Sequence, residues 1–282
     1  MTQDYLDQYR ERGYAVVPGV FSAAEVAELG QAFDRVRETA LAHPRSWRHK
    51  NVLFRTARDT KLGRIVRLVQ WPSYFDAVLQ RTRTDPRIGD IIAPLVGRDV
   101  KQIINQMHWK PRGAAMAEFG YHQDIRFRRP RTAYRDPAAN YVQTGIAIDA
   151  HTSSSGAMTV LPGSHRLGEL NQEIKGSVME TAVSDAELVK LGLDPAGVVP
   201  LEMAPGDVAL WHLHLLHGSG PNTGAPDRRF YINGYVRAAA CDRGEWAFRD
   251  GHPCALGEPV LVHYEELFTR PGPLDLDDAQ SG

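Results

Sequence analysis

A histidine and an aspartate stand two positions apart in the apolar stretch FGYHQDIRFRRP, which begins at Phe119. Residues i and i+2 of a β-strand point to the same face, so His122 and Asp124 are predicted to project together. One nitrogen donor and one oxygen donor make up two-thirds of the 2-His-1-carboxylate set that holds non-haem Fe(II). Roughly 0.8 His-x-Asp pairs are expected by chance in a chain with 11 histidines, so the pair alone is more often structural.

A third ligand is expected from PGDVALWHLHLLHGSGPN, which contains three histidines. Alternation along a single strand places His217 on the same apolar face as Trp211, with His212 and His214 on the opposite face. His217 also stands directly before a Gly-Ser-Gly turn, where its ring could reach the mouth of a cavity. We therefore favour His217. His212 and His214 are a rival metal pair, but such residues are more often surface or interlayer histidines.

An arginine that could bind a carboxylate opens the strand-like run RRFYINGYV, eleven positions after His217. The guanidinium group of Arg228 has the planar, forked shape that binds carboxylates with two hydrogen bonds. An ordinary arginine at the end of a strand is the alternative interpretation, and Arg229 competes for the same role.

Further arginines follow the His-x-Asp pair. If the strand continues past Asp124, its metal-facing side carries Arg126, about 6–7 Å beyond the aspartate, and then Arg128. Arg126 would then hold a carboxylate, phosphate or phosphonate group of an anionic substrate. The alternative is that the strand ends after Asp124 and that RFRRPRTAYRD is a solvated loop paired with acids such as Asp136.

The elements that must position these residues fall into two zones. A short polar helix is predicted over 2–12, followed by an extended segment, YAVVPGVF. Ser22 and Glu25 form a capping box ahead of a helix that Pro44 ends. Helices are also predicted around 72–81 and 86–96, whereas 45–70 has no clear pattern. From about residue 99, short β-branched and aromatic runs alternate with turn residues, which favours an all-β sandwich or barrel.

The composition is that of a globular chain: 282 residues, 43% hydrophobic, 24% charged, with a formal net charge of −1. We expect one domain over 1–270 and a flexible acidic tail over 271–282. The near-neutral charge and short apolar runs predict neither a nucleic-acid partner nor a membrane span. The polar start and only two cysteines, Cys241 and Cys254, favour the cytoplasm. The sequence does not indicate the oligomeric state.

Five motifs carry a resemblance to a known family: YHQD, GIAID, GAMTVLPGSHRLG, APGDVALWH and HGSGPNTGAPDRR. Together with the opening segment YRERGYAVVPGVFSAAEVAEL, they resemble the phytanoyl-CoA dioxygenase family of Fe(II)/2-oxoglutarate oxygenases. The resemblance runs from about residue 5 to 237, and it is poorest at 45–100 and 170–198.

The resemblance implies a mainly β fold, a double-stranded β-helix (jelly roll, cupin-like) with N-terminal helices packed on one sheet. It implies His122, Asp124 and His217 as iron ligands. It also implies that Arg228 clamps the far carboxylate of 2-oxoglutarate, assisted by Ser219 and Lys110. The expected activity is hydroxylation of an unactivated C–H bond of a small molecule. It requires bound Fe(II), consumes 2-oxoglutarate and O2, and releases succinate and CO2.

Other functions stay open on the sequence. Asp124 argues against halogenation, because related halogenases have a small residue in place of the carboxylate. Desaturation, epoxidation and cyclisation use the same iron chemistry. Two alternatives from other classes are a non-catalytic jelly-roll protein that binds metal or ligand, and a zinc hydrolase with the same three ligands.

Three local features bear on the pocket. Many family members have Trp at the position of Gly145, so we expect less bulk near the co-substrate. Many also have Asn-Gly where this chain has Ser155-Gly156. We expect the segment 168–198 to form a mobile lid over the site; the alternative is a fixed surface excursion with a short helix at 185–192.

Overall fold

Two antiparallel sheets dominate the computed structural model, which describes residues 4–114, 118–170, 184–224, 226–262 and 266–277. The larger sheet runs in the order β1 (Tyr14–Val17), β10 (Val208–Trp211), β7 (Tyr141–Ala147), β12 (Arg228–Arg237), β5 (Val100–Lys110), β4 (Gly63–Gln70), β3 (Val52–Asp59), β2 (Ser46–His49) and β15 (Leu274–Leu276). β13 (Glu245–Arg249) pairs with β5, and β14 (His252–Pro253) pairs with β13. The smaller sheet runs in the order β6 (Phe119–His122), β11 (His217–Ser219), β8 (Met158–Val160) and β9 (Val199–Pro200).

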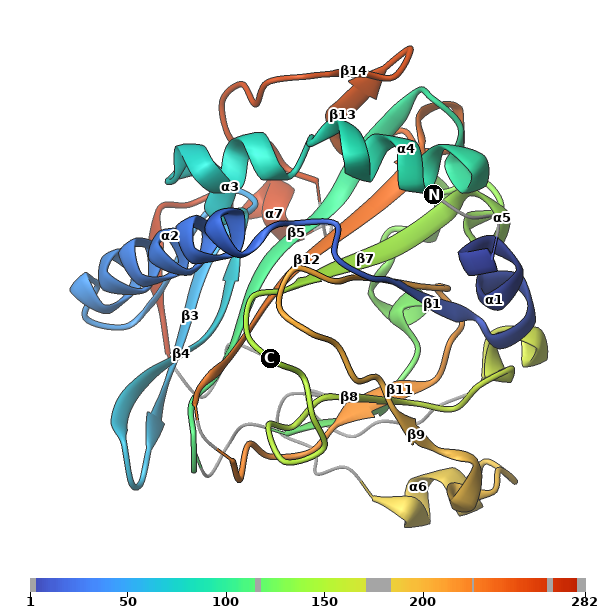
Figure 1. Cartoon of the computed structure of the whole chain (residues 1–282). Coiled ribbons are helices and arrows are strands. Elements are labelled where there is room, and N and C mark those ends of the chain that lie inside the picture. The colour runs from blue at the N-terminus through green and yellow to red at the C-terminus, as the bar shows by residue number, and fades with distance from the viewer. Residues whose placement is uncertain (1–3, 115–117, 171–183, 225, 263–265, 278–282) are drawn as a thin grey trace.

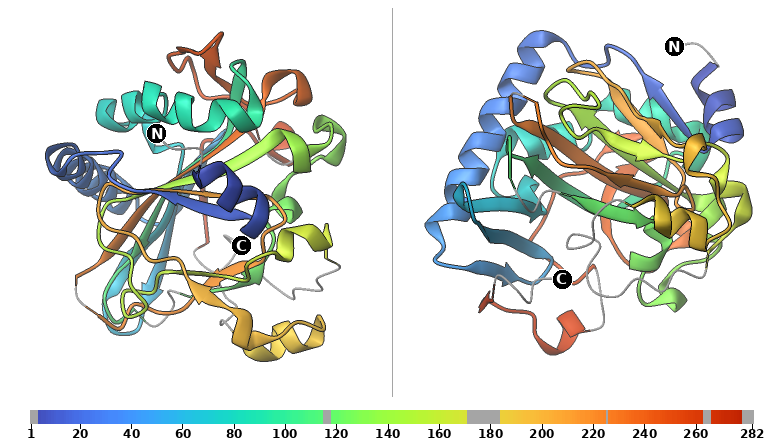
Figure 2. Two further views of the ribbon diagram at one scale, coloured as in Figure 1. Left: turned by 45° about the vertical axis from the view of Figure 1, so that its right-hand side comes forward. Right: turned by 90° about the horizontal axis from the view of Figure 1, so that it is seen from below.

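Helices cover the face of the larger sheet that points away from the smaller one (Figure 1). These are α2 (Ala23–Ala42), α3 (Ala77–Thr82) and α4 (Pro86–Val96), whose apolar residues share one core with the larger sheet. The views of Figure 2 show the smaller sheet on the opposite side of the larger one. Four further helices lie at the margins: α1 (Asp4–Arg12), α5 (Pro137–Asn140), α6 (Asp185–Lys190) and α7 (Glu266–Thr269).

The longest helix begins as the sequence predicts. The Ser22 hydroxyl accepts a hydrogen bond from the backbone N–H of Glu25, and the Glu25 carboxylate accepts one from the backbone N–H of Ser22. This reciprocal pair satisfies two donors that a helix start leaves without partners. The helix ends at Ala42, two residues before Pro44.

Alternation along β5 explains how one strand serves both layers. Met107 and Trp109 point into the core beneath the helices, whereas Lys110 points the other way and donates a hydrogen bond to Ser219 of the smaller sheet. The space between the two sheets is therefore where polar side chains of both sheets meet.

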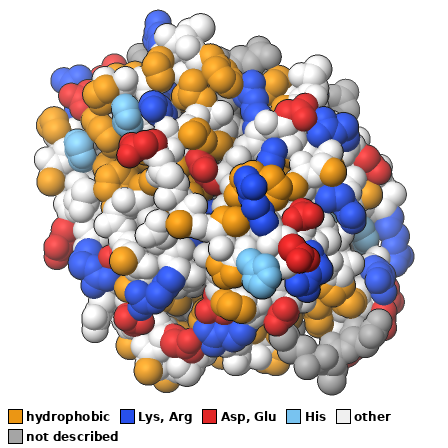
Figure 3. Space-filling model, turned by 90° about the horizontal axis from the view of Figure 1, so that it is seen from above, with side chains coloured by type: hydrophobic (Ala, Val, Ile, Leu, Met, Phe, Trp, Pro, Cys, Tyr) orange, Lys and Arg blue, Asp and Glu red, His pale blue; other side chains and the backbone are white. Residues whose placement is uncertain are grey.

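The predicted fold is confirmed: the chain is a mainly antiparallel double-stranded β-helix with its N-terminal helices on one sheet. The unassigned region 45–70 forms β2, β3 and β4, which extend the larger sheet. Part of the expected tail, Leu274–Leu276, pairs with β2 and so lies in the sheet. No helix among the described residues is long and apolar enough to cross a membrane. Figure 3 shows charges of both signs scattered among apolar side chains on the face seen from above.

Candidate active site

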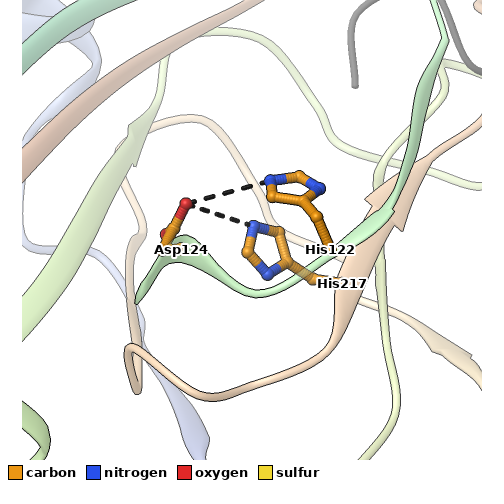
Figure 4. A group of neighbouring side chains, drawn as sticks. All are labelled: His122, Asp124 and His217. Atoms are coloured by element: carbon orange, nitrogen blue, oxygen red, sulfur yellow. Dashed lines mark ion pairs between the residues drawn. The ribbon is translucent and has the colours of Figure 1, made fainter. Parts of the chain in front are cut away.

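Three donors meet where β6 and β11 lie side by side (Figure 4). His122, the last residue of β6, is opposite His217, the first residue of β11, and the ring centroids are 4.3 Å apart. Asp124 Oδ1 lies 3.8 Å from His122 Nε2 and 3.9 Å from His217 Nε2. All three residues are buried, and one ligand atom from each lies within 4.8 Å of the others. These separations leave room for one ion at ordinary bond lengths of about 2.0–2.2 Å.

The strand argument that predicted this cluster is wrong in two details. First, β6 ends at His122, and Asp124 begins a 3₁₀ turn that runs to Phe127. The backbone stays extended at Gln123 (φ −111°, ψ 137°), and this keeps Asp124 on the same side as His122. Second, β10 ends at Trp211, and His217 belongs to a strand of the other sheet. His217 therefore reaches the site because the chain changes sheets between these strands.

Hydrogen bonds fix how each donor points. Nδ1 of His122 lies 2.8 Å from the carbonyl oxygen of Gly120, and Nδ1 of His217 lies 2.9 Å from that of Leu215. A carbonyl can only accept, so each Nδ1 carries the proton and each Nε2 offers a lone pair to a metal. Trp211 Nε1–H donates to Asp124 Oδ2 at 2.9 Å, which leaves Oδ1 facing the two imidazoles.

The surroundings keep these groups in ligand form. Burial, followed by the neighbouring His217, lowers the pKa of His122 to about 3, so its ring is neutral at neutral pH. Burial alone would raise the pKa of Asp124, but His217 and the buried Arg128 lower it by more, and it stays below its usual value. A neutral imidazole and an ionised carboxylate are the forms that bind metal.

Two buried basic side chains, Lys110 and Arg228, lie one strand repeat away from His217, and burial lowers the pKa of Lys110 well below its usual value. Lys110 Nζ donates to Ser219 Oγ at 2.7 Å, to the Gly220 carbonyl and, at 3.4 Å, to the Gly156 carbonyl. Arg228, directly opposite Lys110 in the β5–β12 register, donates from Nη2 to the same Gly156 oxygen at 2.9 Å. Burial lowers the pKa of Arg228 to about 10, so it remains charged at neutral pH.

This pair has the features of an anion site. Among the described residues, neither side chain forms an ion pair with a carboxylate, and Arg228 Nε is buried without a hydrogen-bond partner. Buried charges without counter-charges are costly, so a bound carboxylate would offset the cost. The donor set therefore fits the far carboxylate of a 2-oxo dicarboxylic acid.

The structure separates Arg228 from its competitor Arg229. The Arg229 side chain lies on the other face of β12, where Nε and Nη2 each donate at 2.9 Å to Asp149 and Nη1 donates to the Gly30 carbonyl. Through these contacts, Arg229 links α2 and the segment after β7 to the larger sheet.

Arg126 does not lie on a continued strand. It is part of the 3₁₀ turn, half-buried, with its Cζ 5.3 Å from the Phe127 ring centroid. The Phe127 ring is 5.6 Å from that of His122, and Arg126 contributes to lowering the pKa of His122. The solvated-loop alternative is right that the strand ends before Arg126, but Arg128 and Tyr134 are buried, and the described ion pairs of this loop join Arg131 to Glu169 and Arg135 to Asp242.

The expectation of less bulk near Gly145 is wrong, because its neighbour Phe230 on β12 occupies the space. A Cβ atom at Gly145 would overlap the Phe230 ring, so Phe230 fills the space that Gly145 leaves. The ring stacks on Trp211 at 6.1 Å, and the Arg228 Cζ lies 5.9 Å from its centroid. Phe230 thus contacts both Trp211, which orients Asp124, and the buried Arg228. Sequence reasoning missed this link and the Trp211–Asp124 bond.

The remaining candidates lie elsewhere. The His212 ring contacts those of His165 and His214, and none of these is in the metal-capable group. Residues 171–183 of the proposed lid lie outside the described residues. The rest contains α6, whose buried Leu188 packs with Tyr121 and Leu216.

Known proteins resemble this chain over most of its length. The pattern of the family "Phytanoyl-CoA dioxygenase (PhyH)" matches residues 9–230. A probable alpha-ketoglutarate-dependent hypophosphite dioxygenase from Stutzerimonas stutzeri is 29% identical over 236 residues, covering 83% of this chain and 78% of that protein. A methylphosphonate hydroxylase from Gimesia maris is 25% identical over 252 residues, covering 89% and 86%.

Solved structures agree on the fold. EctD from S. alaskensis with bound Fe superposes with a TM-score of 0.64 at 22% identity, covering 91% of this chain and 86% of that one. The non-haem alpha ketoglutarate dependent carbocyclase SnoK superposes with a TM-score of 0.65 at 19% identity, covering 92% and 94%. The chain belongs to the phytanoyl-CoA dioxygenase family, and with it to the oxygenases that use Fe(II) and 2-oxoglutarate.

Proposed function

We propose that this enzyme hydroxylates an unactivated C–H bond of a small anionic molecule and that three residues hold its Fe(II): His122, Asp124 and His217. Bound Fe(II), with 2-oxoglutarate and O2, supplies an oxidant strong enough for such a bond and yields succinate and CO2 as co-products. The chain's own task is to orient the reactants and to exclude water.

One observation carries the proposal: the metal-capable cluster and the anion site share β11. His217 and Ser219 are two residues apart, which is about 6.7 Å along one face of a strand. Ser219 accepts a hydrogen bond from Lys110, which lies beside Arg228. A five-carbon diacid can span this distance, with its 2-oxo acid end at the metal and its far carboxylate at Arg228.

Replacing Arg228 tests the co-substrate assignment. Arg228→Ala removes a desolvated, charge-assisted pair, so the KM for 2-oxoglutarate should rise by the equivalent of about 2–4 kcal/mol. Arg229→Ala is the matched control: it loses the Asp149 contacts and should lower the melting temperature while the KM changes little. Equal increases in KM for both variants would overturn the assignment.

We propose Arg126 as the residue that binds the anionic group of the substrate. Its place beside Phe127, which contacts His122, supports this. Relatives named for hypophosphite, methylphosphonate and 2-aminoethylphosphonate add support. Arg126→Ala should lose substrate hydroxylation but keep some iron-dependent 2-oxoglutarate consumption, whereas the exposed Arg129→Ala should behave as wild type. Unchanged substrate KM and coupling in Arg126→Ala would remove this role.

We also propose that residues 1–270, together with β15 that extends their larger sheet, form one catalytic domain and that the enzyme works in the cytoplasm. Pairing of β1 with β10 joins the start of the chain to its C-terminal half. Cys241 and Cys254 are both free thiols, which suits a reducing compartment that keeps iron ferrous.

A further inference from the structure

His151 is a fully buried polar side chain for which the function proposed above gives no role. Its backbone is fixed by two hydrogen bonds with Met203, of 2.9 and 3.1 Å. Its ring meets the Phe230 ring edge-on at 4.5 Å. Among the described residues its Nδ1 has no hydrogen-bond partner, and a buried polar atom in that state costs free energy.

His151 and Arg228 both contact the Phe230 ring, which brings His151 near the far end of the proposed co-substrate site. It directly precedes the turn that presents the Gly156 carbonyl to Lys110 and Arg228. Burial first, and then the charges of Arg228 and Lys110, hold the pKa of His151 well below its usual value. The imidazole is therefore neutral at physiological pH and has one N–H to donate.

In the free protein the Arg229 carbonyl favours this proton on Nε2, but only through a long hydrogen bond. Nε2 lies 3.5 Å from the carbonyl oxygen of Arg229, at the limit of a hydrogen bond. A carboxylate bound by Arg228 and Lys110 would be a much better acceptor, and a neutral donor would add a hydrogen bond there without a third positive charge.

We propose that His151 donates from Nδ1 to the far carboxylate of 2-oxoglutarate, beside Arg228 and Lys110. The inference rests on the proposed function, because it requires that the co-substrate lies in this site. His151 is then a third binding residue for the co-substrate, and it contacts the same Phe230 ring as the arginine.

The test measures binding without turnover, by calorimetric titration of Mn(II)-loaded protein with 2-oxoglutarate. His151→Phe keeps a ring and removes the donor, so binding should weaken about tenfold, or about 1.4 kcal/mol. His151→Asn, whose amide N–H lies near the place of Nδ1, should recover most of the affinity. His165→Phe is the matched control, because His165 also has a buried Nδ1 without a described partner but lies beside His212.

Unchanged affinity in His151→Phe would overturn the inference. If that variant does not fold, ¹⁵N spectra of histidine-labelled wild type decide: 2-oxoglutarate should place the proton on His151 Nδ1, and an unperturbed ring would contradict the inference. Arg228→Ala in the same titration separates the two levels of the argument. If Arg228→Ala binds 2-oxoglutarate more weakly while His151→Phe binds it as tightly as wild type, only the role of His151 is refuted. If both variants bind it as tightly as wild type, the co-substrate site itself is refuted.

Discussion

At the scale of single residues, the candidate metal site depends on hydrogen bonds that leave one ligand atom of each side chain free. Backbone carbonyls hold both imidazoles, and Trp211 holds the carboxylate. Residues that orient ligands in this way commonly change metal affinity by 10–100-fold when they are replaced. The site therefore includes Trp211, although it donates no ligand atom.

Replacing Trp211 by Phe should weaken Mn(II) or Fe(II) binding by about 10–100-fold. The substitution removes the N–H bond to Asp124 Oδ2 but keeps an aromatic ring to stack on Phe230. Metal titration measures the effect, and Trp246→Phe, at a half-buried position on β13, is the control. Identical metal affinity in the two variants would show that the Asp124 contact has no such role.

At the scale of elements, Gly145 on β7 and Phe230 on β12 form a pair of complementary size. Gly145→Ala should lower the free energy of unfolding by about 1–3 kcal/mol, because the added methyl group overlaps the ring. The effect should shrink when Phe230 is already Ala, since the ring is then absent. Urea unfolding of the single and double variants measures this coupling. Additive effects would contradict the steric explanation.

The start of α2 gives a pH-dependent prediction. Hydrogen bonds from Arg87 and Ser22 lower the pKa of Glu25 from 4.5 to about 2. A carboxylate whose pKa is lower in the folded state than in the unfolded state stabilises the fold at pH values above the unfolded pKa. This stabilisation is lost as the pH falls through the folded pKa. Glu25→Gln should therefore be less stable than wild type at pH 7, and the difference should diminish between about pH 4.5 and 2. A difference that stays constant over that range would refute the linkage.

The sequence could predict features that depend on residues close together in the chain, but not contacts between distant residues. The capping box and the strand that opens at Arg228 are local signals, and both predictions agree with the structure. The bond between Trp211 and Asp124 joins positions 87 apart, and Phe230 fills the space at Gly145 only because β12 pairs with β7. Strand alternation brought His122 and Asp124 together, although β6 ends between them, because Gln123 keeps the extended conformation.

At the scale of the whole molecule, metal binding is linked to the stability of the fold, because the two histidine ligands lie on different strands, β6 and β11, and are 95 positions apart. A ligand at 100 times its Kd stabilises the folded state by about 2.7 kcal/mol. Mn(II) should therefore raise the melting temperature of wild type and of His212→Ala by several degrees, but not that of His217→Ala. Differential scanning calorimetry measures the shift. A shift in His217→Ala that is lost in His212→Ala would reverse the ligand assignment.

Anaerobic absorption spectroscopy tests the central claim most directly, because a charge-transfer band forms only when the 2-oxo acid chelates Fe(II). Wild-type protein should give this band when Fe(II) and 2-oxoglutarate are added without O2. His122→Ala and Asp124→Ala should give little or none at the same concentrations, and Arg228→Ala should need far more 2-oxoglutarate. Absence of the band in folded wild-type protein, or its full retention in the His122 and Asp124 variants, would contradict the assignment of this site.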